Sequence, residues 1–108
     1  MRTRLARTSI DCPTELAMEI LGGKWKLVIL EHLRDGVRRF GELQRLLPAV
    51  TPRMLTRQLR ELEADGIVHR HVHPVVPPKV EYSLTGLGRD LEPLLAQLRA
   101  WGERYRTL

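Results

Sequence analysis

The sequence contains one cysteine, few aromatic residues and no long apolar run. A single cysteine, Cys12, excludes a disulfide within the chain, which is typical of a cytoplasmic protein. No stretch approaches the roughly 20 apolar residues that a membrane-spanning helix needs. The N-terminus carries basic residues but lacks the apolar segment of a signal peptide. We therefore expect a cytoplasmic protein with no membrane-bound part.

The sequence also lacks the motifs of common catalytic sites. It has no G-x-S-x-G elbow, no P-loop and no H-E-x-x-H pair, and Cys12 has no evident basic partner. Two neighbouring carboxylates, Glu61 and Glu63, would point to different faces of a helix. We therefore expect neither an enzyme nor a bound cofactor.

The chain has enough residues for one domain but not for two. It has 108 residues, of which 43% are hydrophobic, and a formal net charge of +5. We predict a basic, poorly ordered arm over residues 1–12 and a single domain over residues 13–108. The positive charge suits a polyanionic partner, either nucleic acid or an acidic membrane surface. Charge alone fits a merely soluble basic domain equally well.

Apolar spacing predicts three helices and a very short strand in the first half of the chain. The first helix opens at Pro13, carries an apolar stripe and ends at Gly22-Gly23. The second covers about residues 24–33, and a strand of at most 37–40 precedes a third helix over 41–47. The expected inward residues are Leu16, Ala17, Ile20 and Leu21, then Trp25, Val28, Ile29 and Leu33, then Phe40, Leu43 and Leu47.

The second half predicts a helix, a hairpin and a final helix. Thr51 offers a hydroxyl cap, Pro52 fits the first helical position, and Gly66 ends this helix after about Asp65. Strands are expected over 67–73 and 80–84, with a proline-rich tip over 74–79. Thr85 should cap a long final helix with a bend near 89–93, caused by Pro93. This order predicts a mainly α winged helix-turn-helix fold with a small β-hairpin wing.

One face of the predicted helix after Thr51 is rich in arginine. Four side chains fall within an arc of roughly 100° and lie opposite a leucine face. These four are Arg53, Thr56, Arg57 and Arg60. Guanidinium groups can bind guanine edges or phosphates, and the helix N-terminus near Thr51 can hold a phosphate. We therefore expect this face to contact DNA. The alternative is a solvated face on which Arg57 pairs with Glu61, four residues on.

The predicted hairpin offers further candidate contacts. Its prolines stiffen the tip, and Lys79 supplies a charge for the phosphate backbone. Arg39, on the short strand, is another candidate for DNA contact. Three alternating histidines, His69, His71 and His73, share one strand face and could bind zinc or nickel. They equally fit a polar solvent-facing surface, and with no carboxylate or cysteine near them in sequence we predict no metal site.

The final helix carries an apolar seam. Its members are spaced alternately by four and three residues, which is the pattern of a coiled-coil seam, namely Leu87, Leu91, Leu94, Leu98, Trp101, Tyr105 and Leu108. The seam could pack on its own domain, but a domain this small cannot easily cover it. We therefore expect a homodimer formed by the terminal helices, through Leu16, Ile20, Leu94, Leu98, Trp101 and Tyr105. A two-fold dimer would present two recognition helices to a palindromic site.

Three stretches together resemble one family, the HxlR-type transcription regulators, which are relatives of the MarR proteins. The stretches are LGGKWKLVILEHL, RRFGELQRLLPAVTPRMLTRQLRELEADGIVHR and PPKVEYSLTGLGRDLEPLLAQLRAWG, and the resemblance covers about residues 12–104. It implies a dimeric winged helix-turn-helix regulator that binds operator DNA, with Arg53, Thr56, Arg57 and Arg60 on the recognition helix and Lys79 on the wing.

The resemblance also bears on Cys12. Some members of this family sense oxidants or electrophiles through a cysteine just before the first helix, which is where Cys12 stands in DCPTE. The absence of a second cysteine excludes a switch within one chain, but a Cys12–Cys12′ bridge or capture of a small thiol remains possible. A helix N-terminus favours a reactive thiolate, whereas Asp11 and Glu15 oppose it. The alternative is a thiol that only packs at the contact between arm and dimer.

These patterns leave two classes of function in competition. The first is a sequence-specific DNA-binding regulator acting as a homodimer, with an oxidant or small-molecule effector. The second is a winged-helix module for protein–protein contact without a DNA role, which the net positive charge and the arginine face disfavour.

Overall fold

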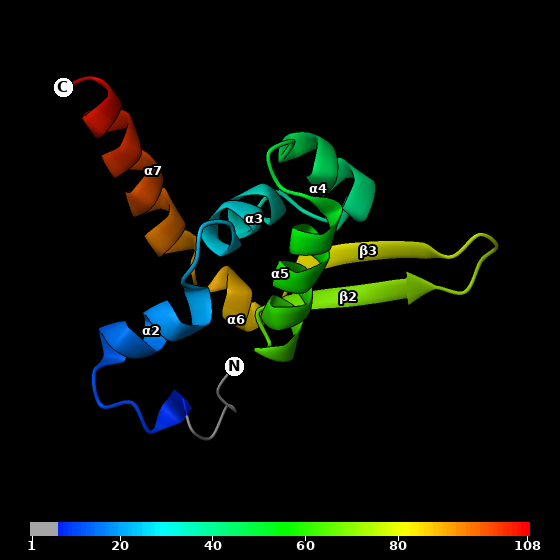
Figure 1. Ribbon diagram of the computed structural model, residues 1–108, viewed down its shortest axis with the longest axis horizontal. Helices are drawn as coiled ribbons and strands as arrows, with labels where there is room; N and C mark the ends of the chain where they lie inside the picture. Colours follow the sequence, from blue (N-terminus) through cyan, green and yellow to red (C-terminus); the bar gives the residue numbers. More distant parts are fainter. Residues whose placement is uncertain (1–6) are drawn as a thin grey trace.

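The protein folds as a mainly helical domain with a three-stranded antiparallel sheet (Figure 1). The computed structural model describes residues 7–108, so the first half of the predicted arm lies outside the described residues. The helices and strands follow in the order α2 (Pro13–Leu21), α3 (Lys26–Leu33), β1 (Arg38–Arg39), α4 (Phe40–Leu46), α5 (Pro52–Ala64), β2 (Val68–His73), β3 (Lys79–Leu84), α6 (Gly86–Arg89) and α7 (Glu92–Arg106). The predicted winged helix-turn-helix fold is confirmed, with each hairpin strand beginning one residue from its expected position.

The core forms where α3, α4 and α5 meet. Three leucines of α5 at helical spacing are fully buried, namely Leu55, Leu59 and Leu62. They pack in one cluster with Ile29, Leu30 and Leu33 of α3 and Leu43 of α4. Burial of each such side chain contributes on the order of 1.5–3 kcal/mol. The cluster therefore fixes the orientation of α5 and leaves its opposite face outward.

Both ends of α5 follow the predicted signals. The Thr51 hydroxyl accepts a hydrogen bond from the Met54 amide at 3.1 Å, and Pro52 occupies the first turn. At the other end Gly66 has a φ of 76°, a left-handed conformation that costs glycine little. The Ile67 amide then donates to the Leu62 carbonyl at 2.9 Å, which starts the chain toward β2.

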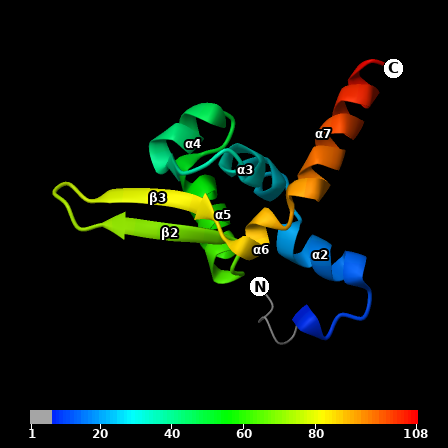
Figure 2. The same ribbon diagram turned by 180° about the vertical axis from the view of Figure 1, so that it is seen from behind.

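The sheet has the order β1-β3-β2, with Val68 opposite Leu84 and His73 opposite Lys79. The very short predicted strand is confirmed as β1, which pairs with β3 through Arg38 and Tyr82. Figure 1 shows the β2–β3 hairpin extending away from the helices, whereas α2 and α7 lie at the opposite end of the molecule. The view from behind in Figure 2 shows the same separation.

The inward face of α3 differs from the prediction. Val28 is 36% exposed, whereas Leu30 is fully buried with Ile29 and Leu33. The helix begins at Lys26 and Trp25 is its N-cap. Because this segment is apolar around most of its circumference, the periodicity could not select the buried face.

The final helix is divided, so the predicted single helix with a bend was wrong. Thr85 caps the short α6, where its hydroxyl accepts from the Gly88 amide at 3.0 Å, and Asp90 ends it. Pro93 lies in the first turn of α7, where a missing amide proton is harmless. Pro93 therefore starts a new helix instead of kinking a continuous one. Within residues 7–108, no helix is long and apolar enough to cross a membrane.

Candidate nucleic-acid interface

The outward face of α5 brings the predicted recognition residues together. Arg53, Thr56, Arg57 and Arg60 line one open surface hollow, together with Phe40, Pro52 and Glu61. The prediction placed Phe40 only in the core, yet its partly buried ring also forms a wall of this hollow. The hollow therefore combines three guanidinium groups with an apolar wall, a mixture suited to phosphates and base edges.

Two threonines that were predicted to contact DNA use their hydroxyl groups within the helix, and of these only Thr56 lines the hollow. The Thr51 oxygen satisfies the Met54 amide, so Thr51 acts as the helix cap. Thr56 donates its hydroxyl proton to the Pro52 carbonyl at 2.8 Å. Thr56 therefore keeps only an acceptor oxygen and a methyl group for an external partner.

The three arginines differ in whether a carboxylate forms an ion pair with them. The Arg57 Nε lies 3.6 Å from Glu61 Oε2, so the predicted i,i+4 pair exists, yet the Arg57 side chain remains 73% exposed. Within residues 7–108, Arg53 and Arg60 form no ion pair. The face is therefore only partly neutralised by its own glutamates.

The predicted positive charge of the wing, that of Lys79, lies at the start of β3 and not in the tip. Lys79 begins β3, and its Nζ lies 3.9 Å from Glu81 Oε1. Glu81 also accepts a hydrogen bond from His73 Nε2; this bond, with the charge of Lys79, holds the pKa of Glu81 below its ordinary 4.5. The residues between the strands are apolar, and Val76 is fully exposed. Lys79 is thus available to a phosphate, but Glu81 moderates its charge.

The three histidines share one sheet face, as predicted. The ring centroids of His71 and His73 are 4.3 Å apart, and Glu81 lies directly opposite His71 on β3. Sequence reasoning missed this carboxylate because it comes from the neighbouring strand. Arg39 pairs with Glu81 in the register of β1, so it joins the wing side of the surface. In the part of the chain described, no cluster of His, Cys, Asp and Glu is arranged to hold a metal ion.

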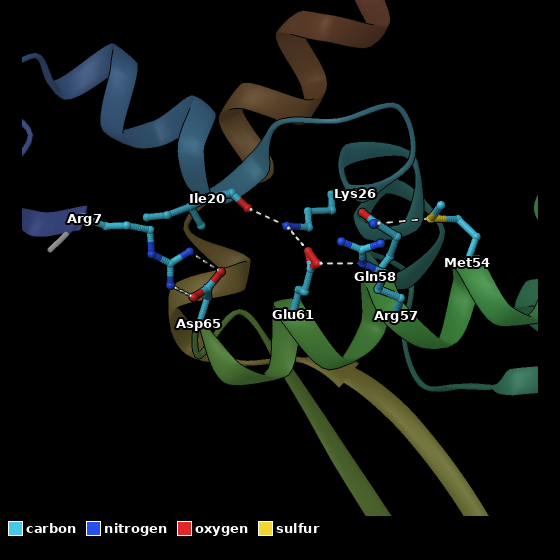
Figure 3. Close-up of polar contacts among 8 residues, drawn as sticks. All are labelled: Arg7, Ile20, Lys26, Met54, Arg57, Gln58, Glu61 and Asp65. Carbon is cyan, nitrogen blue, oxygen red and sulfur yellow. Dashed lines mark hydrogen bonds and ion pairs between the residues drawn. The ribbon is translucent and has the colours of Figure 1, made fainter. Parts of the chain in front are cut away.

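A buried ion pair anchors Arg7 to the end of α5. The Arg7 Nη1 donates to Asp65 Oδ2 at 3.0 Å, and a second bond joins Nη2 to Oδ1 (Figure 3). The two side chains are only 6% and 3% exposed, and the Asp65 carboxylate raises the pKa of Arg7. The prediction assigned Arg7 to the arm and missed this contact, for which the sequence gives no local signal.

Comparison with known proteins agrees with this geometry. A model of the HxlR-like helix-turn-helix family matches residues 20–108. The chain belongs to the HxlR family. It is 58% identical over 97 residues to an uncharacterized HTH-type transcriptional regulator, YybR of Bacillus subtilis (strain 168), over 90% of this chain and 78% of that protein.

Two solved structures are similar to this HxlR-family chain. The HTH-type transcriptional regulator ytcD has a TM-score of 0.86 and 52% identity, over 90% of this chain and 99% of that chain. The redox regulator HypR in its reduced form has a TM-score of 0.85 and 57% identity, over 88% of this chain and 94% of that chain. The predicted resemblance is confirmed, and this family consists of transcription regulators and not of enzymes.

The remaining predicted residues of this HxlR-type regulator lie away from the wing. Cys12 is an exposed free thiol at the N-cap of α2, and its carbonyl accepts from the Leu16 amide at 3.0 Å. Leu16 and Ile20 are partly buried and line an apolar hollow between α2 and α6.

The apolar side chains predicted on the last helix are exposed along α7. Leu94 is 42% exposed, Leu98 43%, Trp101 56% and Tyr105 64%. The rings of Trp101 and Tyr105 stack with centroids 5.4 Å apart. Within one chain, this face of α7 therefore remains open to solvent.

Proposed function

We propose that this HxlR-type regulator is a cytoplasmic homodimer that binds a palindromic DNA operator through α5 and the β2–β3 wing. The observation that carries the proposal is the single hollow lined by Arg53, Arg57 and Arg60 on a helix whose opposite face is locked into the core. The major groove of DNA is wide enough to admit one such helix, and arginine is the side chain most often found on guanine.

The charges around α5 support this role. Glu61 lies in the C-terminal half of α5 and Asp65 is its C-cap, but Lys26 lies 3.3 Å from Glu61 and Arg7 is hydrogen-bonded to Asp65. Cations from other elements thus offset these two carboxylates. The arginines of α5 then meet DNA phosphates with less repulsion from Glu61 and Asp65.

The exposed apolar face of α7 supports dimerisation. Leu98, Trp101 and Tyr105 form a stripe that a second copy could cover. Helix α2, which carries Leu16 and Ile20, lies at the same end of the molecule as α7 (Figure 1). Two-fold symmetry would then present two α5 helices to half-sites about 34 Å apart.

Regulation through Cys12 forms a further part of the proposal. Its thiol is exposed, and the similar HypR is named a redox regulator. Two Cys12 thiols could form a Cys12–Cys12′ disulfide, releasing two protons and passing two electrons to an oxidant. A mild thiol oxidant should then change operator affinity in the parent protein but not in Cys12→Ser, and equal responses in both proteins would exclude this role.

The DNA-binding proposal is tested by removing one guanidinium from α5. Arg57→Ala should weaken binding to a duplex that the parent protein selects from a randomised DNA pool by about 5- to 150-fold, the range expected for one bidentate base contact. The measurement is a fluorescence-anisotropy titration at fixed salt.

Arg106→Ala is the matched control. Arg106 is 78% exposed and pairs with Glu103 at 3.6 Å, which closely resembles the pairing and exposure of Arg57, but it lies on α7. This variant should bind as the parent does. If the parent protein binds no DNA at low salt, the alternative of a protein–protein module is favoured.

A further inference from the structure

Lys26 is a buried cation that joins three helices. Its side chain is only 6% exposed, although lysines are seldom buried without a partner. The Nζ lies 3.4 Å from the Ile20 carbonyl of α2 and 3.3 Å from Glu61 Oε1 of α5 (Figure 3). Lys26 therefore links α2, whose N-cap is Cys12, to α5, which carries the arginine face.

The contact with Ile20 completes the end of α2. The last carbonyls of a helix have no partner within it and carry partial negative charge, which a cation stabilises. No basic residue stands in the last turn of α2. Lys26 supplies this charge from α3, so its ammonium group is held in place independently of Glu61.

The contact with Glu61 reaches the DNA-facing surface. Glu61 is 18% exposed, and while Oε1 faces Lys26, Oε2 faces Arg57 Nε at 3.6 Å. The carboxylate thus lies at ion-pair distance from the Nε of the Arg57 guanidinium. The side chain as a whole stays 73% exposed, so its outer edge is open to a partner.

We propose that Lys26 and Glu61 are positioning residues that orient Arg57 for base recognition. This inference rests on the proposed function. Lys26 and Glu61 cancel in charge, so the trio keeps one positive charge, which belongs to Arg57. The Glu61 tether restricts the Arg57 rotamers before DNA arrives, and less conformational entropy is then lost on binding.

The other two arginines provide the contrast. Arg53 and Arg60 line the same hollow but form no ion pair within residues 7–108. Untethered guanidinium groups adapt to phosphates, which carry no sequence information. Sequence preference is therefore concentrated at Arg57, whereas Arg53 and Arg60 contribute general affinity.

Without Lys26, the Arg57 guanidinium should pair with the Glu61 carboxylate instead of contacting DNA bases. A nearly buried carboxylate without its lysine would draw the guanidinium inward and repel nearby phosphates. The measured quantity is the specificity ratio, the dissociation constant for random duplex divided by that for the selected duplex. Lys26→Met should lower this ratio about tenfold, within the range for one base contact.

A double-mutant cycle separates positioning from a general structural effect. In an Arg57→Ala background, Lys26→Met should leave the specificity ratio unchanged, because the residue it positions is gone. Adding Glu61→Gln to Lys26→Met should give the same ratio as Glu61→Gln alone, because Lys26 acts on Arg57 only through the Glu61 carboxylate. Equal effects of Lys26→Met in the presence and absence of Arg57 would overturn the inference.

If circular dichroism shows that Lys26→Met does not fold, Glu61→Gln tests the inference instead. It keeps the shape of the side chain and removes the tether's charge. Its specificity ratio should fall about tenfold, while affinity for random duplex stays equal or rises because a negative charge near phosphates is lost. A ratio equal to that of the parent would overturn the inference. If the parent protein selects no sequence at all, the proposed function itself fails, and the inference with it.

Discussion

The helices α5 and α7 are similar in length, 13 and 15 residues, yet they present opposite chemistry to their surroundings. α5 buries Leu55, Leu59 and Leu62 and shows arginines outward, whereas α7 buries only Leu95 and shows leucine and aromatic side chains. An outward charged face gains from a polyanion, whereas an outward apolar face gains from another apolar surface. The comparison therefore predicts a different partner for each helix, DNA for α5 and a second copy for α7.

The largest effect is expected from a charged substitution on the exposed apolar face of α7. Leu98→Glu places a charge in the middle of the exposed apolar stripe, where dimer formation would bury it at high cost. The protein should become monomeric, and operator affinity should fall by about 10²- to 10⁴-fold because the two half-sites are no longer bound together. Light scattering and a binding titration measure the two effects.

Leu98→Met is the control for this change. It keeps an apolar side chain of similar volume and should remain dimeric with unchanged DNA affinity. A Leu98→Glu protein that stays dimeric would mean that α7 does not form the dimer contact.

A smaller effect is expected from removing the ion pair between Arg7 and Asp65 at the end of α5. Arg7→Met leaves the buried Asp65 carboxylate without its partner, which should lower the free energy of unfolding by about 3 kcal/mol. Chemical denaturation measures this loss. The salt dependence of DNA binding should not change, because Arg7 is buried and does not face the hollow. An unchanged unfolding midpoint would show that the ion pair does not stabilise the fold.

The smallest effect is expected at the wing. The hydrogen bond from His73, with the charge of Lys79, lowers the pKa of Glu81 below 4.5 in the folded protein, so the ionised form stabilises the hairpin. This stabilisation is fully present above about pH 4.5 and is lost as the pH falls through the folded-state pKa. The parent should therefore melt at a higher temperature than Glu81→Gln at pH 7. At pH 3 the gap should be smaller, and an equal gap at both pH values would contradict the assignment.

The sequence predicted the parts of the fold that depend on local signals. The limits of α5 follow from the Thr51 cap, Pro52 and the left-handed Gly66, each of which acts within one turn. The arginine face follows from helical spacing alone, and the hollow confirms that its members lie together. The buried face of α3 was missed because a helix that is apolar on most sides has no periodicity to mark one face. The break before α7 was missed because a proline can either bend a helix or start a new one.

The parts that escaped prediction depend on tertiary packing. Nothing local in the sequence marks Lys26 as buried, but in the fold it contacts both α2 and α5. Arg7 and Asp65 are 58 residues apart, and Glu81 reaches His73 only because the hairpin register brings their side chains together. Such ionic contacts carry no periodic signal, so only the folded arrangement reveals which charges are neutralised and which remain free.

The salt dependence of DNA binding by the parent protein tests the account most directly. If the arginine faces of two α5 helices bind phosphates, the logarithm of the association constant should fall linearly with the logarithm of salt concentration, by about 0.9 for each phosphate neutralised. Six or more contacts across a dimer should cost about a thousandfold in affinity between 50 and 200 mM salt. Affinity that is independent of salt, or an absence of binding at the lowest salt, would contradict the assignment of α5 to DNA.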